Sequence, residues 1–317
     1  MDSTTRVAVC SRSFSRNLDL RDQLVARYQN VKFNDDGLAL AGDELVNFLN
    51  KADKAIIGLE VINRSVLSQL PNLKVIGKYG VGLDKLDFDA LEEFGVQLGW
   101  TAGVNARSVA ELAVNLMLTL VRKSHLSQKL VEDGEWRQIV GRELSSMVIG
   151  ILGCGNVGEQ LIQILRGFGC RVLFCDLRPR QELCATYEVT QVEFSELVKT
   201  VDVLSLHLPK NASTENIISA RVLADMKDGS FIINTARGGL IEEKLLLAGL
   251  ESGKLAGVGL DVFTREPPDY FDLIHHENCI VTSHIGGSSE EAIFSMGMAA
   301  IEGLDVFMPA KQVEQYG

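Results

Sequence analysis

The feature that most constrains the fold is an apolar run that ends in three spaced glycines, VIGILGCGNVG, from Val148 to Gly158. It reads as a strand, a tight turn and the start of a helix, because apolar residues at helical spacing follow the last glycine. Gly153 would permit the turn, Gly155 would let a pyrophosphate approach the backbone, and Gly158 would let the helix pack closely on the strand. In this context the run predicts a dinucleotide-binding loop, and a purely structural turn is the alternative.

An acidic residue follows where such a domain contacts the adenosine ribose. The next apolar run, Val172–Cys175, ends at Asp176, whose carboxylate would accept both ribose hydroxyls and repel a 2′-phosphate. The sequence therefore favours NAD over NADP as cofactor. Arg178 and Arg180 argue the other way, because a guanidinium would tolerate that phosphate.

Short apolar runs alternate with helical patterns over most of the chain, which is typical of parallel α/β sheets. In the N-terminal part, strands are expected at Arg6–Cys10, Lys54–Gly58, Leu73–Gly77 and Val96–Trp100, with a helix at Asp43–Leu49. Later strands, which together describe a doubly wound sheet, are expected at Met147–Leu152, Arg171–Cys175, Val201–Leu206, Ser230–Asn234, Gly257–Asp261 and Cys279–Thr282.

A long helix is expected between these two parts, from about Ser108 through about Leu130. Ser108 and Glu111 have the spacing of a capping box, in which a hydroxyl and a carboxylate satisfy each other's backbone donors. Leu112 and Leu116 continue an apolar stripe at helical spacing.

Charge and composition narrow the class of protein. A net charge of −11 and a pI near 5.0 argue against a nucleic-acid partner, which needs a basic face. The N-terminus lacks the pattern of a signal peptide, and no segment stays apolar and uncharged for the ~20 residues of a membrane span. The 6 cysteines form no CxxC pair and no metal-ligand pattern with histidine. We therefore expect reduced thiols, no metal site, no membrane partner and a cytoplasmic location.

Three polar residues follow late strands, where ligands bind in open α/β sheets. Arg237 follows Ile232–Ala236, Glu266 follows Gly259–Phe263, and His284 follows Ile280–Ser283. Taken singly, each is more often a structural or surface residue.

Several longer motifs occur in one order along nearly the whole chain. They are GVGLDKLD (Gly80–Asp87), TAGVNARSVAELA (Thr101–Ala113), the glycine loop, HLP (His207–Pro209), INTARGGLIEE (Ile233–Glu243), GLDVFTREP (Gly259–Pro267) and SHIGGSSEEA (Ser283–Ala292). Through them the chain resembles the D-isomer-specific 2-hydroxyacid dehydrogenases, and within that family the phosphoglycerate dehydrogenase-like branch. The resemblance implies hydride transfer between NAD(H) and carbon 2 of a small anionic 2-oxo or 2-hydroxy acid.

The resemblance also implies that Arg237, Glu266 and His284 are the catalytic set. The chemistry agrees, because hydride transfer at carbon 2 requires a proton at the oxygen, and histidine titrates in the right range. Glu266 would favour the imidazolium form of His284. Arg237 would hold the substrate carboxylate with two parallel hydrogen bonds.

Other roles rest on the same resemblance. Asp261 is expected at the nicotinamide carboxamide, although it would also serve as a turn cap. Val81 and Gly82 would offer backbone N–H groups to the substrate carboxylate, with a plain turn as the alternative. Asn105 resembles a substrate-side residue, but asparagine is also an ordinary helix cap. Further cofactor contacts are expected at Asn156, Val157, His207, Pro209, Thr214, Thr235, Ala236, His284 and Gly286.

The chain departs from the branch in one place that bears on substrate. Where phosphoglycerate dehydrogenases carry an arginine for the phosphate, this sequence has Gly58-Leu59-Glu60-Val61, and Glu60 would repel a phosphate. Lys78 stands where the branch often has arginine and keeps one positive charge for the substrate, without the bidentate fork.

The expected organisation is two Rossmann-like domains, with the NAD domain inserted in the substrate domain. Residues 1–104 and 291–317 would form the substrate domain, and residues 105–290 the NAD domain. The helical pattern from Glu290 to Phe307 would return to the first part, and closure about Asn105 and Glu290 would shut the active site. The length leads us to expect no C-terminal regulatory domain.

The helix near Ser108 and the loop at Trp136 resemble a dimerisation element, so we expect a homodimer. Alternatives to a phosphoglycerate dehydrogenase-like activity remain open. One is an NAD(H)-sensing binding protein or corepressor on the same fold. Others are a hydroxypyruvate or glyoxylate reductase and an enzyme that oxidises an inorganic or one-carbon donor.

Overall fold

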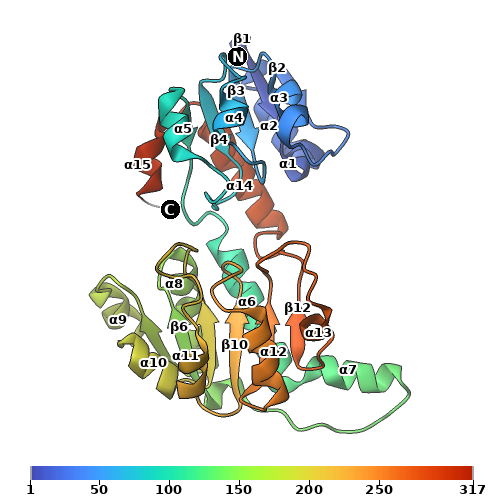
Figure 1. Ribbon diagram of the computed structural model, residues 1–317, viewed down its shortest axis with the longest axis vertical. Helices are drawn as coiled ribbons and strands as arrows, with labels where there is room; N and C mark the ends of the chain where they lie inside the picture. Colours follow the sequence, from blue (N-terminus) through green and yellow to red (C-terminus); the bar gives the residue numbers. More distant parts are fainter. Residues whose placement is uncertain (1, 316–317) are drawn as a thin grey trace. The chain divides into compact units, whose positions relative to one another are not determined.

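The computed structural model describes residues 2–315 and divides into two compact units. The first unit is formed by the described residues up to Asn105 and from Gly287 onward, and the second is Ala106–Gly286. Each unit is built on its own sheet (Figure 1). The expected fold class, two α/β units with doubly wound parallel sheets, is confirmed.

The sheet of the first unit is parallel except at one edge. Its strand order is β13 (Met308–Pro309), β5 (Gln97–Gly99), β4 (Val75–Lys78), β3 (Lys54–Ile57), β1 (Asp2–Val9) and β2 (Tyr28–Phe33). β13 runs antiparallel to β5. The sequence patterns missed both edge strands. β2 (YQNVKF) is rich in polar residues because an edge strand is only partly covered.

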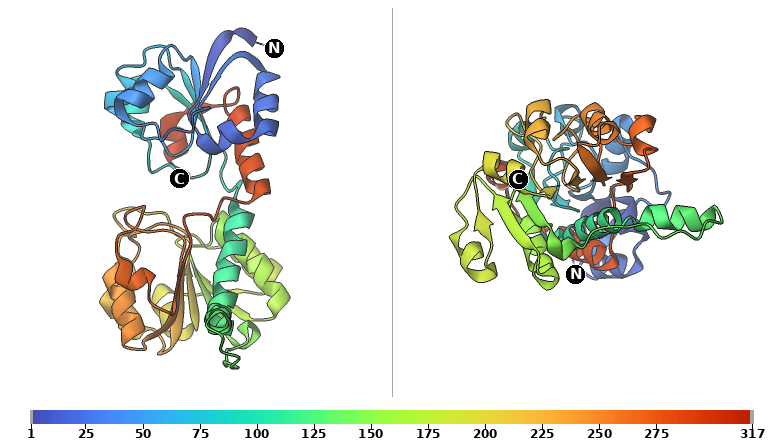
Figure 2. Two further views of the ribbon diagram at one scale, coloured as in Figure 1. Left: turned by 90° about the vertical axis from the view of Figure 1, so that its right-hand side faces the viewer. Right: turned by 90° about the horizontal axis from the view of Figure 1, so that it is seen from below.

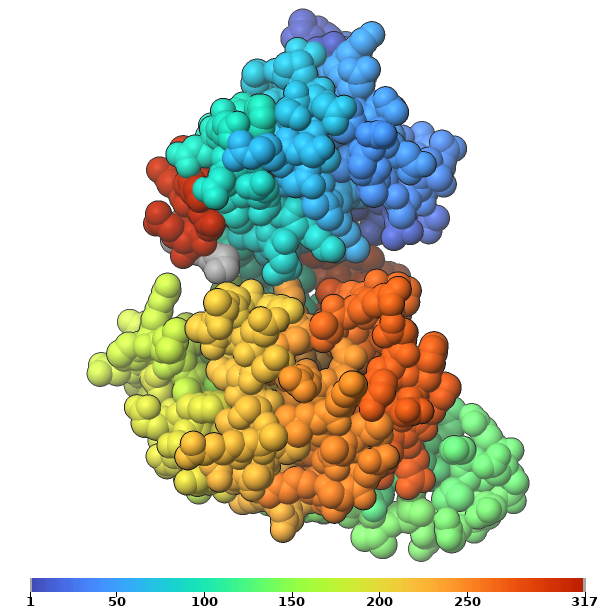
Figure 3. Space-filling model, viewed as in Figure 1, coloured from blue at the N-terminus to red at the C-terminus, as the bar shows by residue number. Residues whose placement is uncertain are grey.

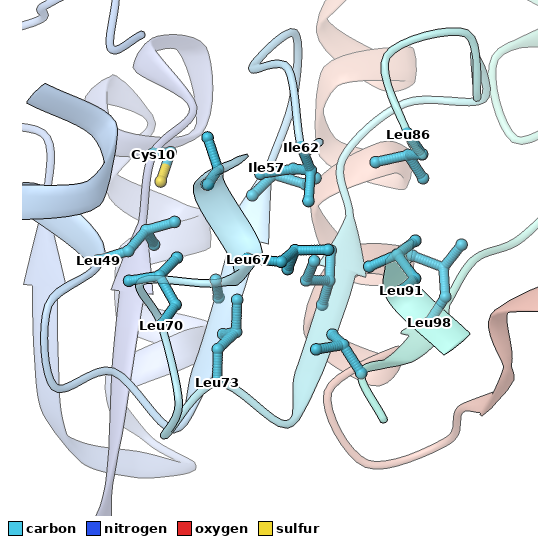
Figure 4. Packing of buried hydrophobic residues seen from close by; sticks show 14 of the residues in the cluster. Cys10, Leu49, Ile57, Ile62, Leu67, Leu70, Leu73, Leu86, Leu91 and Leu98 are labelled. Carbon is cyan, nitrogen blue, oxygen red and sulfur yellow. The ribbon is translucent and has the colours of Figure 1, made fainter. Parts of the chain in front are cut away.

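Successive strand residues point to opposite sides of this sheet, and apolar residues occur on both sides. Helices therefore cover both faces. Val7 and Val9 pack among residues of α1 (Arg12–Arg16), α2 (Leu18–Val25) and α14 (Glu290–Glu302). Ala8 belongs to the core on the other face. Figure 4 shows part of that core, with Cys10, Ile57 and Leu98 among its labelled residues. That face is covered by α3 (Gly42–Leu49), α4 (Arg64–Leu67), α5 (Phe88–Glu93) and α15 (Ala310–Glu314).

α14 approaches the first sheet very closely, and glycines make this possible. A Cβ atom on Gly99 would lie 2.0 Å from the carbonyl oxygen of Gly303, and one on Gly77 would lie 2.2 Å from that of Ala300. The helix ends at Glu302 rather than at Phe307 as expected. The chain must turn there, because β13 pairs with β5 a few residues later.

The sheet of the second unit is parallel throughout. Its strand order is β12 (Cys279–Val281), β11 (Leu255–Leu260), β10 (Ser230–Asn234), β9 (Val203–Leu206), β6 (Val148–Leu152), β7 (Arg171–Cys175) and β8 (Thr190–Gln191). All the expected strands are present within a few residues. β8 was missed because a two-residue edge strand leaves no periodic signal.

Two layers of helices enclose this second sheet, as the views in Figure 2 show. Ile149 and Ile151 belong to the core on one face, whereas Leu152 belongs to the core on the other. The first face is covered by α6 (Ala106–Arg122), α8 (Asn156–Leu165) and α9 (Gln181–Tyr187). The second is covered by α10 (Phe194–Thr200), α11 (Ala220–Asp225), α12 (Glu243–Glu251) and α13 (Phe271–Ile274).

The long helix expected from Ser108 through Leu130 was wrong in two respects. It is broken at Lys123, which has a left-handed φ of 54°, so that α6 ends at Arg122 and α7 (Ser124–Glu132) follows. The capping box is also absent. Ser108 lies inside α6 and donates its hydroxyl to the Gly286 carbonyl at 2.6 Å, while Glu111 accepts from Arg107. The helix begins earlier than the pattern indicated, so the hydroxyl bonds to a distant segment instead.

α7 and the loop that follows it in the sequence project from the second unit, as the green segment of Figure 3 shows. None of the residues of α7 is buried. In the loop, Trp136 is 92% exposed and Val140 is 86% exposed. Large apolar side chains in such a position are typical of a contact surface.

Candidate functional site

The glycine loop joins β6 to α8, and the space around each of its three glycines differs. Gly153 has a φ of +90°, and a Cβ on it would lie 2.7 Å from the His207 carbonyl oxygen. A Cβ on Gly158 would lie 2.6 Å from the Gly153 carbonyl oxygen. Gly155 is exposed, and nothing lies within 4 Å of a Cβ placed on it. Close packing therefore leaves no room for a side chain at Gly153 and Gly158, whereas the space beside Gly155 is open.

α8 begins at Asn156, with Gly155 as its N-cap. The N–H groups of its first turn, which includes Val157, point out of the helix end together with the positive end of the helix dipole. This end is a suitable place for a pyrophosphate.

Asp176 follows β7 and is held in a fixed orientation. Its Oδ2 accepts from the Cys154 N–H at 2.8 Å, and its Oδ1 accepts from the Arg178 N–H at 2.9 Å. A carboxylate can accept further hydrogen bonds, so these contacts orient Asp176 and leave acceptor positions for the ribose hydroxyls. The Arg180 guanidinium, by contrast, is committed to the Cys154 carbonyl and to Glu159.

Two buried polar atoms lie at the ends of the neighbouring strands β9 and β10. Among the residues that the structure describes, His207 Nδ1 and Thr235 Oγ1 have no hydrogen-bond partner. His207 Nε2 lies 2.8 Å from Ser205 Oγ. Burial lowers the pKa of His207 to about 4, so the imidazole is neutral near pH 7. Such atoms call for a polar ligand, and together with the open Gly155 they fit bound NAD.

The remaining expected cofactor residues shape nearby turns. Thr214 Oγ1 donates to the Pro209 carbonyl at 2.6 Å and accepts from the Asn211 N–H at 2.9 Å. The Ala236 N–H donates to Asn234 Oδ1 at 3.0 Å. These contacts show how the segments are held, and direct contact with a cofactor stays a prediction for them.

Glu266 and His284 are brought together by two loops that follow adjacent strands, β11 and β12. His284 Nδ1 lies 2.8 Å from Glu266 Oε2, and both side chains are partly exposed. Glu266 Oε1 accepts from the Phe263 N–H at 3.2 Å, which fixes the carboxylate from its other side. His284 has a left-handed φ of 56°, which is uncommon for a residue other than glycine. The pair has the arrangement of a proton-transfer group and its orienting carboxylate.

Asp261 holds the loop that carries His284. Its side chain is only 1% exposed and accepts from Thr282 Oγ1 at 2.6 Å, from the Ile285 N–H at 2.7 Å and from the Gly286 N–H at 2.8 Å. The Asp261 carbonyl accepts from the His284 N–H at 2.9 Å. These hydrogen bonds support the turn-capping alternative for Asp261, and its contact with a nicotinamide stays a prediction.

Arg237 lies in the loop that follows β10, the next strand of the sheet. Asn234 Nδ2 donates to the Arg237 carbonyl at 2.8 Å, and Arg237 Nη1 donates to the Ala236 carbonyl at 2.7 Å. Because β10, β11 and β12 are adjacent and parallel, the loops with Arg237, Glu266 and His284 all leave the same edge of the sheet. The sequence order alone did not place them on adjacent strands.

The residues expected at the substrate in the first unit lie at the carboxyl ends of β3 and β4. Lys78 is 4% exposed, and its Nζ donates to the Gly58 carbonyl at 2.7 Å and to the Tyr79 carbonyl at 3.1 Å. The Gly58 N–H donates to Glu60 Oε2 at 2.6 Å. Lys78 and Glu60 therefore hold the same glycine from its two sides, which sequence spacing did not reveal.

The turn after Lys78 is shaped by Gly80, whose φ is +100°. Trp100 Nε1 donates to the Val81 carbonyl at 3.1 Å, and both Val81 and Gly82 are half-buried. Asn105 Oδ1 is buried and has no hydrogen-bond partner within the described part of the chain.

Within residues 2–315, no group of three or more His, Cys, Asp or Glu side chains is placed to hold a metal ion. In the same residues, no helix has the length and apolar character that a membrane crossing requires.

The glycine loop, the acidic residue after β7 and the parallel sheet define the class of the second unit: a Rossmann-type NAD-binding domain of an oxidoreductase. Residues 114–286 match the family described as D-isomer specific 2-hydroxyacid dehydrogenase, NAD binding domain. The chain belongs to this family of NAD-dependent oxidoreductases, as the resemblance had implied.

Similarity to individual proteins extends over most of the chain. A hydroxypyruvate reductase of Thermotoga maritima is 35% identical over 270 residues, which cover 83% of this chain and 87% of that protein. A D-3-phosphoglycerate dehydrogenase of Methanocaldococcus jannaschii is 35% identical over 268 residues, covering 83% of this chain. The match spans only 51% of that longer relative. A D-lactate dehydrogenase of Aquifex aeolicus, solved with NAD and lactic acid, superposes with a TM-score of 0.83 at 25% identity, covering 94% of this chain and 93% of that one.

Proposed function

We propose that the chain reduces a small 2-oxo acid that carries no phosphate, such as hydroxypyruvate or glyoxylate, with NADH as the reductant. The observation that carries this proposal is the 2.8 Å hydrogen bond between His284 and Glu266 at the carboxyl edge of the second sheet. The similarity to the hydroxypyruvate reductase supports the substrate class.

His284 would supply the proton. NADH, when bound, supplies a hydride to carbon 2 of the acid. Because Nδ1 of His284 faces Glu266, Nε2 is the nitrogen that would donate to the substrate oxygen. The carboxylate of Glu266 holds the ring in one orientation and stabilises its positive charge until the proton leaves.

Arg237 would bind the substrate carboxylate. Its guanidinium presents donors in a planar fork that matches a carboxylate. The bond from Asn234 to the Arg237 carbonyl fixes the backbone from which this side chain extends. The grip would orient carbon 2 for hydride transfer.

Glu60 and Lys78 support an acid without a second anionic group. Glu60 places a carboxylate at the edge of the first sheet, where ligands bind in open α/β sheets. Lys78 directs its ammonium to two backbone carbonyls and is buried. Its charge would therefore do little to offset the repulsion between Glu60 and a phosphate. The backbone N–H groups of Val81 and Gly82 would donate hydrogen bonds to the single carboxylate of the substrate, which Arg237 would also bind.

The cytoplasm and a homodimer complete the proposal. All 6 cysteines are free, which suits a reducing compartment. The exposed Trp136 and Val140, in the loop that follows α7, would contact a second copy of the chain.

The test is NADH consumption with four acids: hydroxypyruvate, glyoxylate, phosphohydroxypyruvate and phosphonopyruvate. We expect kcat/KM at least about tenfold higher for the first two than for the last two. Glu60→Gln should narrow that gap, and Leu59→Ser, at an exposed neighbour, is the matched control. Preference for a phosphorylated acid would overturn the substrate class. Absence of turnover with all four acids, with NADH still bound, would favour a dinucleotide-sensing protein instead.

A further inference from the structure

Arg180, in the turn between β7 and α9, reaches back to the glycine loop. Its Nη1 donates to the Cys154 carbonyl at 2.7 Å, and its Nη2 lies 3.1 Å from Glu159 Oε2 on α8. Both side chains of this ion pair are about one-third exposed, at 31% and 35%. The guanidinium thus connects the loop to the helix whose N-terminus follows it.

Cys154 is held on its other side by Asp176. The Cys154 N–H donates to Asp176 Oδ2 at 2.8 Å, while its carbonyl accepts from Arg180. Two residues of opposite charge from one turn therefore fix both backbone groups of this loop residue. The Cys154 side chain is buried, so the residue cannot turn without losing core packing.

Gln191 on β8 fixes the turn itself. Its Oε1 accepts from the Arg180 N–H at 2.9 Å, and its Nε2 donates to the Asp176 carbonyl at 3.1 Å and to the Arg178 carbonyl at 3.0 Å. The position of the Arg180 backbone is therefore set independently of any ligand. Arg178, in the same turn, has an exposed side chain.

This arrangement bears on the choice between NAD and NADP. The 2′-phosphate of NADP carries about two negative charges and lies on the ribose that Asp176 would contact. Asp176 repels it, and a nearby guanidinium would offset this repulsion. The Arg180 guanidinium binds the same residue as Asp176, Cys154, but it is already paired with the carboxylate of Glu159.

We propose that Arg180 is a positioning residue that holds the glycine loop for the dinucleotide, and that Glu159, by pairing with it, keeps the site selective for NAD. The inference concerns the cofactor end of the second unit and does not depend on which acid is reduced. It predicts that the two arginines of the turn differ in their effect, although both lie close to Asp176.

The test is calorimetric titration of the ligand-free protein with NADH and NADPH, which needs no substrate. Glu159→Gln should improve NADPH binding about threefold to fivefold relative to NADH, because the guanidinium loses its partner. Arg180→Gln should weaken NADH binding about tenfold with no gain for NADPH. The double variant should lose the NADPH gain of Glu159→Gln. Arg178→Gln removes the other guanidinium of the turn and is the control for loop positioning, so it should leave NADH binding within about twofold.

Thermal unfolding of each variant separates a folding defect from an effect on the ligand, since a structural defect would not change the ratio of the two affinities. An unchanged ratio in Glu159→Gln would overturn the proposal. So would an Arg178→Gln variant that behaves like Arg180→Gln. Wild-type protein that binds neither dinucleotide would overturn it together with the NAD assignment, whereas inactivity on every acid with normal NADH binding would overturn only the proposed function.

Discussion

Glu266 Oε2 lies 2.8 Å from His284 Nδ1, although the two residues follow different strands and belong to different motifs. The bond is possible because β11 and β12 are adjacent and parallel. Their loops therefore leave the sheet at the same edge. Asp261, at the end of β11, also binds the backbone of the loop with His284 and fixes its course.

Replacing His284 with Gln should reduce kcat about 10³-fold, because no group then donates the proton to the substrate oxygen. Glu266→Gln keeps a polar neighbour and should cost less, about tenfold, through loss of the negative charge. NADH binding, measured by calorimetry, should stay within about twofold in Glu266→Gln, and in His284→Gln, which also loses an expected cofactor contact, it should change far less than kcat. Equal activity of His284→Gln and wild type would exclude this histidine as the proton donor.

Gly155→Ala should leave stability unchanged and weaken NADH binding at least about tenfold. The protein has open space at this position, where the pyrophosphate would approach. Gly153→Ala should instead unfold at lower temperature, because its Cβ would meet the His207 carbonyl and its φ is positive. Thermal unfolding and calorimetry together distinguish the two effects. Normal NADH affinity in Gly155→Ala would contradict the placement of the cofactor.

His207 should make the protein less stable as the pH falls. Burial lowers its pKa from 6.5 to about 4, so between these values the unfolded chain binds a proton that the folded chain does not. The free energy of unfolding should therefore fall as the pH is lowered from 6.5 to about 4, by at most about 3 kcal/mol. Urea unfolding of wild type and His207→Gln across this range measures it. The difference in unfolding free energy between the two proteins should change by this amount across the range, to the disadvantage of the wild type at low pH, and parallel curves would contradict the prediction.

Gly99→Ala should destabilise the first unit by about 3 kcal/mol, because its Cβ would lie 2.0 Å from the Gly303 carbonyl oxygen and would push α14 off the sheet. Gly95→Ala is the control. Nothing lies within 4 Å of its Cβ, so only the positive φ of 67° opposes the change, at about 1 kcal/mol. Urea unfolding compares the two. A larger loss at Gly95 would be inconsistent with the close packing of α14.

The exposed apolar loop behind α7 should hold two copies of the chain together. Light scattering should then give about twice the 34.7 kDa of the single chain, and Trp136→Ser combined with Val140→Ser should shift the mass toward that of one chain. Leu177→Ser is the control, because Leu177 is equally exposed but lies elsewhere on the second unit. A single-chain mass for the wild type at micromolar concentration would exclude the dimer.

Local patterns predicted the buried strands well, because a central parallel strand such as Ile149–Leu152 is apolar on both faces. They failed at the sheet edges, where β2 and β8 lack that pattern. They also failed at Lys123. A helical stripe continues across that residue in the sequence, and only the backbone shows the break. Ser108 was read as a cap because its spacing from Glu111 is suitable, but its actual partner, the Gly286 carbonyl, is far away in sequence.

By itself the sequence determined the fold class, the glycine loop and the acidic residue after it, because these depend on local spacing and side-chain chemistry. The catalytic set of Arg237, Glu266 and His284 was expected from the family resemblance and stays a prediction. Only the tertiary structure decided which of them meet. The pairing of Glu266 with His284, the hydrogen bond of Lys78 to Gly58, and the hydrogen bonds of Arg180 to Cys154 and Glu159 all join residues from different strands or loops. The order of strands in each sheet brings them together, and no periodicity along the chain records that order.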